Sequence, residues 1–433
     1  TFLWGLLLPA ALLGQATPSP LTMEAAVAYA LDNSNTIKNA RVQIADAEQQ
    51  IKEQLSTGLP KINGTLDINH FLEVPVLPLP EAFAMDPDAP ESIAFQLRNN
   101  FTAGISAQTM IFNGSFFVGL RAARAARKYY DTELENQQQT VRNQVINAYL
   151  PLLLIRENLE QLDKNITNLE ALLQETTAFY EAGFVEQLDV DRLQLNLDNL
   201  QIERTNLERQ QTNALRALKF TMNYPQGQEL NIEDDLEELN FEAEEALLQG
   251  PIPYQQRAEV RVLDQALVLQ DLQVELQRAA FLPTVNASLS GQYQFQGDKL
   301  SDGFWAPTVV LGINAVVPIY DFGGRRARVE RAKLEKETAL NQRDDLIRGI
   351  ELSVINARTD FTSASERLEA RLRSRNLAER IYETTQIKYR EGVGSSLEVV
   401  QAEQELYTAQ SNYLTALYET ILSKESLKQA LGR

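Results

Sequence analysis

Four segments of the chain alternate apolar and polar residues with a period of two, the pattern of a β-strand with two different faces. In the third segment, Val285, Leu289 and Phe295 fall on one face, and Asn286 and Gln292 fall on the other. The apolar faces consist of Ile62, Leu66 and Ile68; Phe101, Ala103, Ile105, Ala107 and Ile111; Val285, Ala287, Leu289, Tyr293 and Phe295; and Val309, Leu311, Ile313, Ala315, Val317 and Ile319. Each segment runs about 10 to 13 residues, which predicts transmembrane β-strands. Aromatic residues that could mark the membrane interface stand at strand ends: Phe71, Phe304, Trp305 and Tyr320. A soluble β-sandwich is the alternative.

Other long segments carry apolar residues in alternating steps of four and three, which predicts coiled-coil helices. The stripes are Val141, Val145, Ala148, Leu152, Ile155, Leu159, Leu162, Ile166, Leu169 and Leu173; Leu193, Leu197, Leu200, Leu207, Ala214 and Leu218; and Ile350, Val354, Ala357, Phe361, Ala364 and Leu368. Gly183, Gly392 and Gly394 interrupt the helical pattern and predict two antiparallel hairpins. The first arm, from Ser115 to Tyr180, has a length of roughly 100 Å as a helix. Pro151 is expected to kink it.

The chain is internally duplicated. Residues 145–148 (VINA) recur at 354–357, and Tyr180, Gly183, Leu188 and Val190 recur as Tyr389, Gly392, Leu397 and Val399, always 209 positions later. The segment LPKINGTL from Leu59 has a counterpart, LPTVNASL, from Leu282. Each half of the chain therefore holds two strands and one long hairpin.

These patterns divide the chain into segments. Residues 1–16 are expected to be a signal peptide with a clipped start, because the apolar run from Phe2 to Leu13 is too short to span a bilayer. The others are an N-terminal periplasmic helix in 17–58 (from about Leu21 to Thr57); strands in 59–113 with an external loop at 72–98; a hairpin in 114–222 with its tip near 183; an acidic equatorial segment in 223–256; a helix in 257–281; strands in 282–320; and a hairpin in 321–433 with its tip near 392.

Four strands are too few to close a barrel, and open sheet edges are not tolerated in hydrocarbon. If the strands span a membrane, copies of the chain must complete the barrel. The sequence therefore predicts an assembly of at least two protomers.

Composition excludes much chemistry. The 433 residues include no cysteine and one histidine, His70, so thiolate metal sites, disulfides and cysteine nucleophiles are ruled out. The net charge of −19 disfavours nucleic acid and favours cationic partners. Asp321-Phe322-Gly323 matches a kinase metal-binding triplet, but without the other kinase motifs we interpret it as a strand-to-helix turn. We predict no enzyme activity, cofactor or metal.

Several short motifs together resemble the TolC-like outer-membrane efflux proteins over about Leu21 to Leu431. They are IFNG at Ile111, IYDFGG at Ile319, the paired LP starts, and the hairpin tips YEAGFVEQLDV and YREGVGSSLEV. The resemblance implies an α+β membrane protein: a homotrimer whose twelve strands form an outer-membrane β-barrel continuous with a periplasmic α-helical tunnel. It also implies export, with a periplasmic adaptor and an inner-membrane pump as partners. A soluble periplasmic coiled-coil adaptor or scaffold is the alternative function.

The candidate functional residues lie at the hairpin tips. Gly183, Phe184, Gly392, Val393 and Gly394 are expected to dock an adaptor, because they are small or apolar and exposed. A periplasmic gate is expected at Asp189, Asp191 and Glu398, with Tyr180 and Tyr389 near the contacts that hold it closed. Rings of acids would select cations, although acids at helix starts also simply favour the helix dipole. Some family members latch this entrance with an arginine in the second tip, where this chain has Gly394 or its neighbours.

Overall fold

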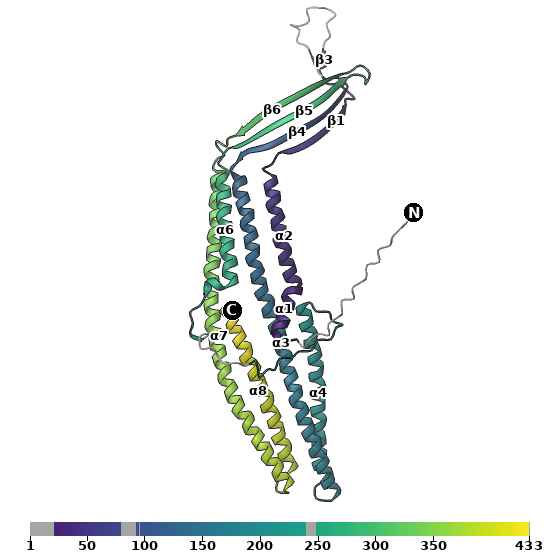
Figure 1. The fold of residues 1–433 in the computed structure, drawn as a ribbon, viewed down its shortest axis with the longest axis vertical. Coiled ribbons are helices and arrows are strands. Elements are labelled where there is room, and N and C mark those ends of the chain that lie inside the picture. The colour runs from purple at the N-terminus through teal and green to yellow at the C-terminus, as the bar shows by residue number, and fades with distance from the viewer. Residues whose placement is uncertain (1–20, 79–91, 95, 240–247, 433) are drawn as a thin grey trace, which may run out of the picture. The chain divides into compact units, whose positions relative to one another are not determined.

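The computed structural model describes residues 21–78, 92–94, 96–239 and 248–432. The predicted signal peptide lies outside the described residues. The helices are α1 (Met23–Asn33), α2 (Asn35–Ser56), α3 (Gly114–Glu181), α4 (Gln187–Met222), α6 (Ala258–Ala279), α7 (Gly324–Arg390) and α8 (Ser396–Ala430), with a short 3₁₀ helix at Tyr254–Gln256. The strands are β1 (Lys61–His70), β2 (Val76–Pro78), β3 (Ser92–Ala94), β4 (Asn99–Asn113), β5 (Thr284–Gly297) and β6 (Phe304–Val316) (Figure 1).

The chain folds as two compact units. The sheet unit comprises Gln43–Asp131 and Leu263–Gln342, and the hairpin unit comprises Thr1–Val42, Thr132–Val262 and Arg343–Arg433. Helices α2, α3, α6 and α7 have residues in both units.

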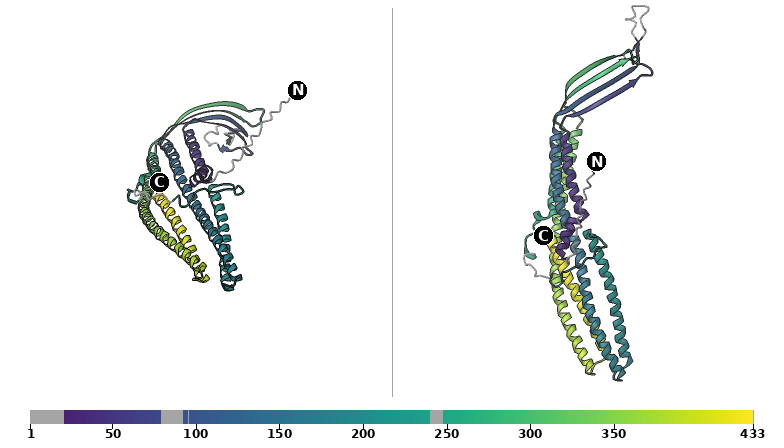
Figure 2. Two further views of the ribbon diagram at one scale, coloured as in Figure 1. Left: turned by 60° about the horizontal axis from the view of Figure 1, so that its bottom comes forward. Right: turned by 45° about the vertical axis from the view of Figure 1, so that its right-hand side comes forward.

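The four predicted strands form one antiparallel sheet in the order β1-β4-β5-β6, which is curved in both views of Figure 2. Their predicted apolar faces coincide in the observed register except at two places. A bulge between Met110 and Phe112 pairs Phe112 rather than the predicted Ile111 with Val285, and β6 ends at Val316, before the predicted Val317 and Ile319. One row across the sheet is Ile68, Phe101, Phe295 and Trp305, and another is Ile62, Ala107, Leu289 and Leu311. Most of this apolar face is exposed in the described chain: Leu311, for example, is 78% exposed, whereas Phe295 is buried among neighbouring aromatic rings.

The two outer strands of the sheet each have one neighbour. Among the described strands, β1 pairs only with β4, and β6 pairs only with β5. One edge of each outer strand therefore presents backbone N–H and C=O groups without a ladder partner.

The external segment between β1 and β4 is more regular than the sequence predicted. Val76–Pro78 and Ser92–Ala94 form a short antiparallel ladder, β2-β3, where only an irregular loop was expected.

Aromatic rings line one end of the sheet. Phe101 and Phe295 stack with ring centroids 5.4 Å apart, and Tyr293 and Trp305 stack at 5.1 Å. Cross-strand aromatic pairs of this kind stabilise the register of neighbouring strands.

Asp321 caps the helix that follows β6. Its carboxylate accepts hydrogen bonds from the Arg325 backbone N–H at 2.8 Å and from Arg325 Nε at 3.1 Å. The interpretation of Asp321-Phe322-Gly323 as a strand-to-helix turn is confirmed.

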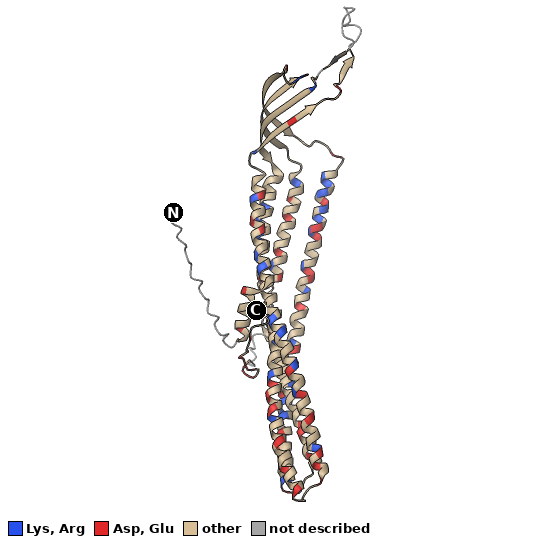
Figure 3. Cartoon of the chain, turned by 90° about the vertical axis from the view of Figure 1, so that its right-hand side faces the viewer, with Lys and Arg blue, Asp and Glu red and all other residues tan. Residues whose placement is uncertain are grey.

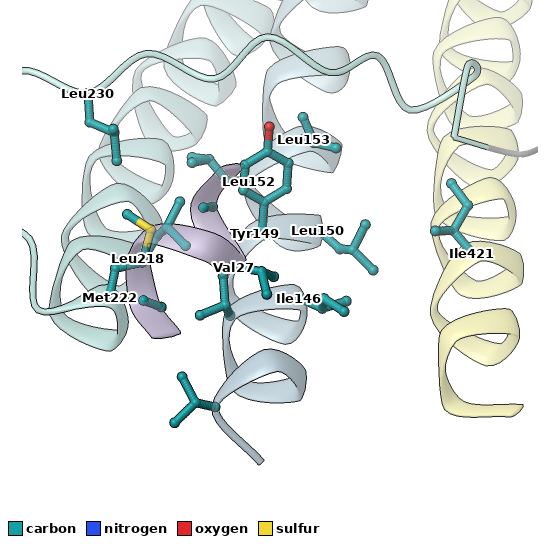
Figure 4. Packing of buried hydrophobic residues seen from close by; sticks show 14 of the residues in the cluster. Val27, Ile146, Tyr149, Leu150, Leu152, Leu153, Leu218, Met222, Leu230 and Ile421 are labelled. Atoms are coloured by element: carbon teal, nitrogen blue, oxygen red, sulfur yellow. The ribbon is translucent and has the colours of Figure 1, made fainter. Parts of the chain in front are cut away.

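The hairpin unit is built on the predicted heptad stripes. Val145, Leu162, Leu169 and Leu193 are fully buried. One core cluster joins α1, α3, α4 and α8 around Tyr149, with Leu218 and Met222 facing it from α4 (Figure 4). The Tyr149 hydroxyl donates a hydrogen bond to the Leu21 carbonyl at 2.8 Å. Helix α3 continues through Pro151, between the buried Leu150 and Leu152.

One continuous helix was expected from about Leu21 to Thr57, but this region forms two helices. It divides into α1 and α2 at Ser34, whose extended backbone (ψ 133°) interrupts the helical path. The buried Ser34 hydroxyl accepts a hydrogen bond from the Thr36 N–H at 3.2 Å and so satisfies a donor in the first turn of α2.

The first part of the equatorial segment forms hydrogen bonds with both helical hairpins, through α3 and α8. The Arg156 guanidinium on α3 donates to the carbonyls of Ile232 and Asp234, and the Tyr413 hydroxyl on α8 donates to Glu237 at 3.2 Å. Residues 240–247 of this segment lie outside the described chain.

Charged residues are distributed unevenly between the elements. The helices carry lysine, arginine, aspartate and glutamate along their length, whereas the strands carry few (Figure 3). In the part of the chain that the structure describes, no helix combines the length and the apolar character needed to cross a membrane.

Candidate functional site: the tips of the helical hairpins

Both hairpin tips use the same backbone motif. After α3, Gly183 has φ +81°, the Phe184 N–H donates to the Phe179 carbonyl at 2.9 Å, and the Gly183 N–H donates to the Tyr180 carbonyl at 2.9 Å. This pair of bonds ends a helix in a Schellman motif, which favours glycine at the left-handed position.

The second tip repeats this geometry. Gly392 has φ +76°, and the N–H groups of Val393 and Gly392 donate to the carbonyls of Lys388 and Tyr389, each at 3.0 Å. The third tip glycine differs, since a Cβ at Gly394 would lie 3.1 Å from the Tyr389 nitrogen. Close backbone approach is the reason for glycine there.

The motif places one apolar side chain at the end of each tip. Phe184 is 80% exposed and Val393 is 78% exposed, and they occupy the same position in the two Schellman motifs. Exposed apolar groups on a turn are available for contact with another protein.

The candidate acids Asp189 and Glu398 both lie in the first turn of a returning helix, on α4 and α8 respectively. Asp189 is half-buried and accepts hydrogen bonds from the Glu186 N–H at 3.3 Å and from the Ser396 hydroxyl of the other hairpin. Glu398 and Asp191 are exposed. Asp189 and Glu398 therefore occupy equivalent positions in the sequence repeat, but of these two acids only Asp189 accepts a hydrogen bond from the opposite hairpin.

The two candidate tyrosines also differ. The Tyr389 ring is 7% exposed, and its hydroxyl shares a hydrogen bond with the buried Thr176 hydroxyl of α3 at 3.2 Å. Burial raises the pKa of the Tyr389 hydroxyl above its ordinary value, at which it is already uncharged at neutral pH. Tyr180, by contrast, is 41% exposed.

Sequence reasoning missed an ion pair between the hairpins. Arg390 Nε on α7 lies 3.0 Å from a Glu175 carboxylate oxygen on α3. Arg390 stands two residues before Gly392, whereas the position expected to carry a latching arginine was that of Gly394 or its neighbours. A basic residue in the last turn of α7 was the available signal.

Three polar contacts thus link the two hairpins of one chain near their tips: Thr176 with Tyr389, Glu175 with Arg390, and Asp189 with Ser396. Among the described residues, no group of three or more metal-binding side chains is gathered here or elsewhere.

Comparison with known proteins decides the family. The profile described as "Outer membrane efflux protein" matches residues 26–223 and 254–433. The chain belongs to this family. Its outer-membrane location and its function as an efflux channel follow, and the soluble adaptor alternative is not supported.

Two curated members of the family cover most of the chain. The pyoverdine export outer membrane protein OpmQ of Pseudomonas aeruginosa is 23% identical over 344 residues, covering 77% of this chain and 70% of that relative. The outer membrane protein TolC of Vibrio cholerae is 24% identical over 345 residues, covering 76% of each chain.

Solved structures share the fold of this efflux protein. The outer membrane protein VceC of Vibrio cholerae matches with a TM-score of 0.72 at 16% identity, covering 95% of this chain and 96% of VceC. The CmeC outer membrane channel of Campylobacter jejuni matches with a TM-score of 0.70 at 20% identity, covering 98% and 90%. The predicted fold class, a duplicated chain of helical hairpins that contributes four strands to a shared barrel, is confirmed.

The exposed tips of the efflux protein generate a prediction about docking. Changing Phe184→Asp together with Val393→Asp should abolish export, because the apolar surface at both tips is lost. Assembly should be unaffected, since neither side chain is buried. Export of a pump substrate from cells and gel mobility without boiling measure the two properties.

The control is Leu195→Asp on α4, an exposed side chain above the tip. Export that continues in the tip variant would contradict docking through these residues. Loss of assembly would show that the tip side chains serve folding instead.

Proposed function

We propose that three copies of this chain form one continuous duct, a β-barrel joined to a helical tunnel, which serves as the outer-membrane exit of a tripartite export system. Each copy contributes its four-stranded sheet and its two hairpins. A periplasmic adaptor docks at the hairpin tips, and an inner-membrane pump supplies the cargo. The duct carries out no catalytic step and binds no nucleic acid.

The observation that carries this proposal is the sheet with two open edges and one continuous apolar face. The register aligns the apolar faces of all four strands, and β1 and β6 each leave one edge free among the described strands. Lipid is the environment in which such a face is stable, and a closed barrel is the only arrangement that satisfies the edges there.

The relatives of this chain are named for chemically different cargoes. Relatives bear names that refer to pyoverdine export and to toluene efflux, which are chemically unlike compounds. Such variety within one family favours a duct that leaves the choice of substrate to the pump.

We further propose that Asp189, Asp191 and Glu398 form an acidic entrance. Threefold symmetry would repeat each acid around the tunnel axis, where walls of low dielectric concentrate the negative potential. The polar contacts of Tyr389, Arg390 and Asp189 would hold the two hairpins of each chain together while this entrance is closed.

The lipid-facing side of the sheet can be tested with arginine. Leu311→Arg should destabilise the barrel by about 2 to 4 kcal/mol at the middle of the bilayer and reduce the heat-stable assembly. Ser290→Arg, which lies on the opposite face of the neighbouring strand, should be tolerated. Equal losses on unboiled gels for the two variants would refute the assignment of the faces.

The acidic entrance can be tested in planar bilayers. Asp189→Asn with Glu398→Gln should lower the preference for cations and weaken block by multivalent cations, because two negative charges per chain are removed. The matched control, Asp198→Asn with Glu405→Gln, removes the same charge from exposed positions on the same two helices. Unchanged selectivity in the first pair would show that its acids only stabilise helix starts.

A further inference from the structure

A column of polar side chains crosses the interface between the two hairpins. On α8, Ser396, Glu403 and Gln410 follow one another at intervals of seven residues, so they lie on one face of the helix. Their hydrogen-bond partners on the other hairpin are Asp189, Asn196 and Asn165. The column interrupts a seam that otherwise buries mainly leucine, valine and alanine, with Ile166, Tyr382 and Tyr389.

The middle member of this column is the exceptional one. Glu403 is 4% exposed and accepts a single hydrogen bond, from the Asn196 side-chain amide on α4 at 2.8 Å. Its second oxygen, Oε1, is buried and has no hydrogen-bond partner within the described residues. Buried Leu197, Val399 and Leu406 belong to the same cluster. An ionised carboxylate in such a place loses its hydration without a compensating charge.

The groups that face Glu403 do not neutralise it. Asn196 on α4 is uncharged, and the titratable group that interacts with it from α7 is the Tyr382 hydroxyl. Burial, and then the Glu403 charge, raise the pKa of Tyr382 to about 12, while the Arg390 charge on α7 opposes the shift. The Tyr382 hydroxyl is neutral near pH 7 and cannot compensate a charge on Glu403. On α8 itself, Tyr407 is influenced by Glu203 of α4 rather than by Glu403. Burial raises the pKa of Glu403 to about 7, although the hydrogen bond from Asn196 opposes the shift.

We propose that Glu403 and Asn196 are a positioning pair that holds the two hairpins of one chain together, and that Glu403 does so as an uncharged carboxylic acid, so that loss of its proton favours separation of the hairpins. This inference rests on the proposed function insofar as separation widens the duct entrance. The pair lies seven residues beyond the Asp189–Ser396 contact on each helix, away from the tips.

The direction of the pH effect follows from the two protonation states. Below about pH 4.5, the ordinary value for glutamate, Glu403 is protonated whether the hairpins are packed or apart. Between that pH and about 7, hairpins that are apart release the proton first. The packed arrangement therefore loses its advantage as the pH rises through this window. The ratio of packed to separated hairpins should fall at least about tenfold between pH 5 and pH 8.

The separation can be measured without export or conductance. The chain contains no cysteine, so Asn199→Cys on α4 and Gln401→Cys on α8 give two unique spin-labelling sites on exposed positions. Labelled chain assembled with an excess of unlabelled chain limits the signal to distances within one chain. Double electron–electron resonance at pH 5 and pH 8 then reports the distance between the hairpins.

The labelled protein with native Glu403 should give one short distance at pH 5 and gain a longer population at pH 8. Glu403→Gln, which keeps the shape and the hydrogen-bond acceptor, should give the short distance at both values. Glu405→Gln, an exposed acid on the same helix, should behave like native protein. An unchanged distance in native protein, or an identical pH response in Glu403→Gln, would overturn the proposal.

Single-channel recordings separate this inference from the proposed function. If the distance responds to pH and the native conductance rises with it, both stand. If the distance responds while the protein forms no channel, the duct is refuted and the positioning pair stands. If Glu403→Gln does not assemble, the native titration alone decides, because a constant distance from pH 5 to pH 8 overturns the pair.

Discussion

The structure depends on backbone hydrogen bonding at the two edges of a four-stranded sheet. An unpaired N–H or C=O group in hydrocarbon costs several kcal/mol, and the free edges of β1 and β6 each present a row of them. In water these groups would be hydrogen-bonded to solvent, but the apolar face that includes Leu289 and Leu311 would then be exposed to water. Pairing with further copies of the chain meets both requirements. Duplication within the chain supplies two strands from each half, so that a few copies suffice.

The hairpin unit follows a different physical rule. Clusters around Tyr149 and Leu169 bury apolar stripes within and between the hairpins, whereas the column of Ser396, Glu403 and Gln410 joins the hairpins through single hydrogen bonds. A typical hydrogen bond contributes only about 0.5 to 1.5 kcal/mol net, since water replaces the lost partner on separation. Polar seams of this kind can part more readily than apolar ones, which suits an entrance that must open.

The sequence predicts the parts of this fold in which a hydrophobic pattern repeats over many residues. Alternation over ten or more residues revealed all four strands and their common apolar face, and heptads revealed the hairpin arms. It did not reveal the break at Ser34 or the β2-β3 ladder, which depend on one or a few residues. The contacts Glu175–Arg390 and Asn196–Glu403 were also beyond it, because the register between two hairpins is set by tertiary packing. For the contact of Glu403, the available signal was a glutamate at a position where α8 otherwise faces the core.

Closure of the sheet by copies of the chain is the central claim, and disulfide cross-linking tests it most directly. Because the chain lacks cysteine, one cysteine at Leu66 on β1 can be combined with single cysteines along β6. Closure predicts cross-links between different chains only, confined to the position of β6 that lies opposite Leu66 of the neighbouring chain, with products that end at the size of three chains. Cross-links confined to single chains, or their absence at every position of β6, would contradict it.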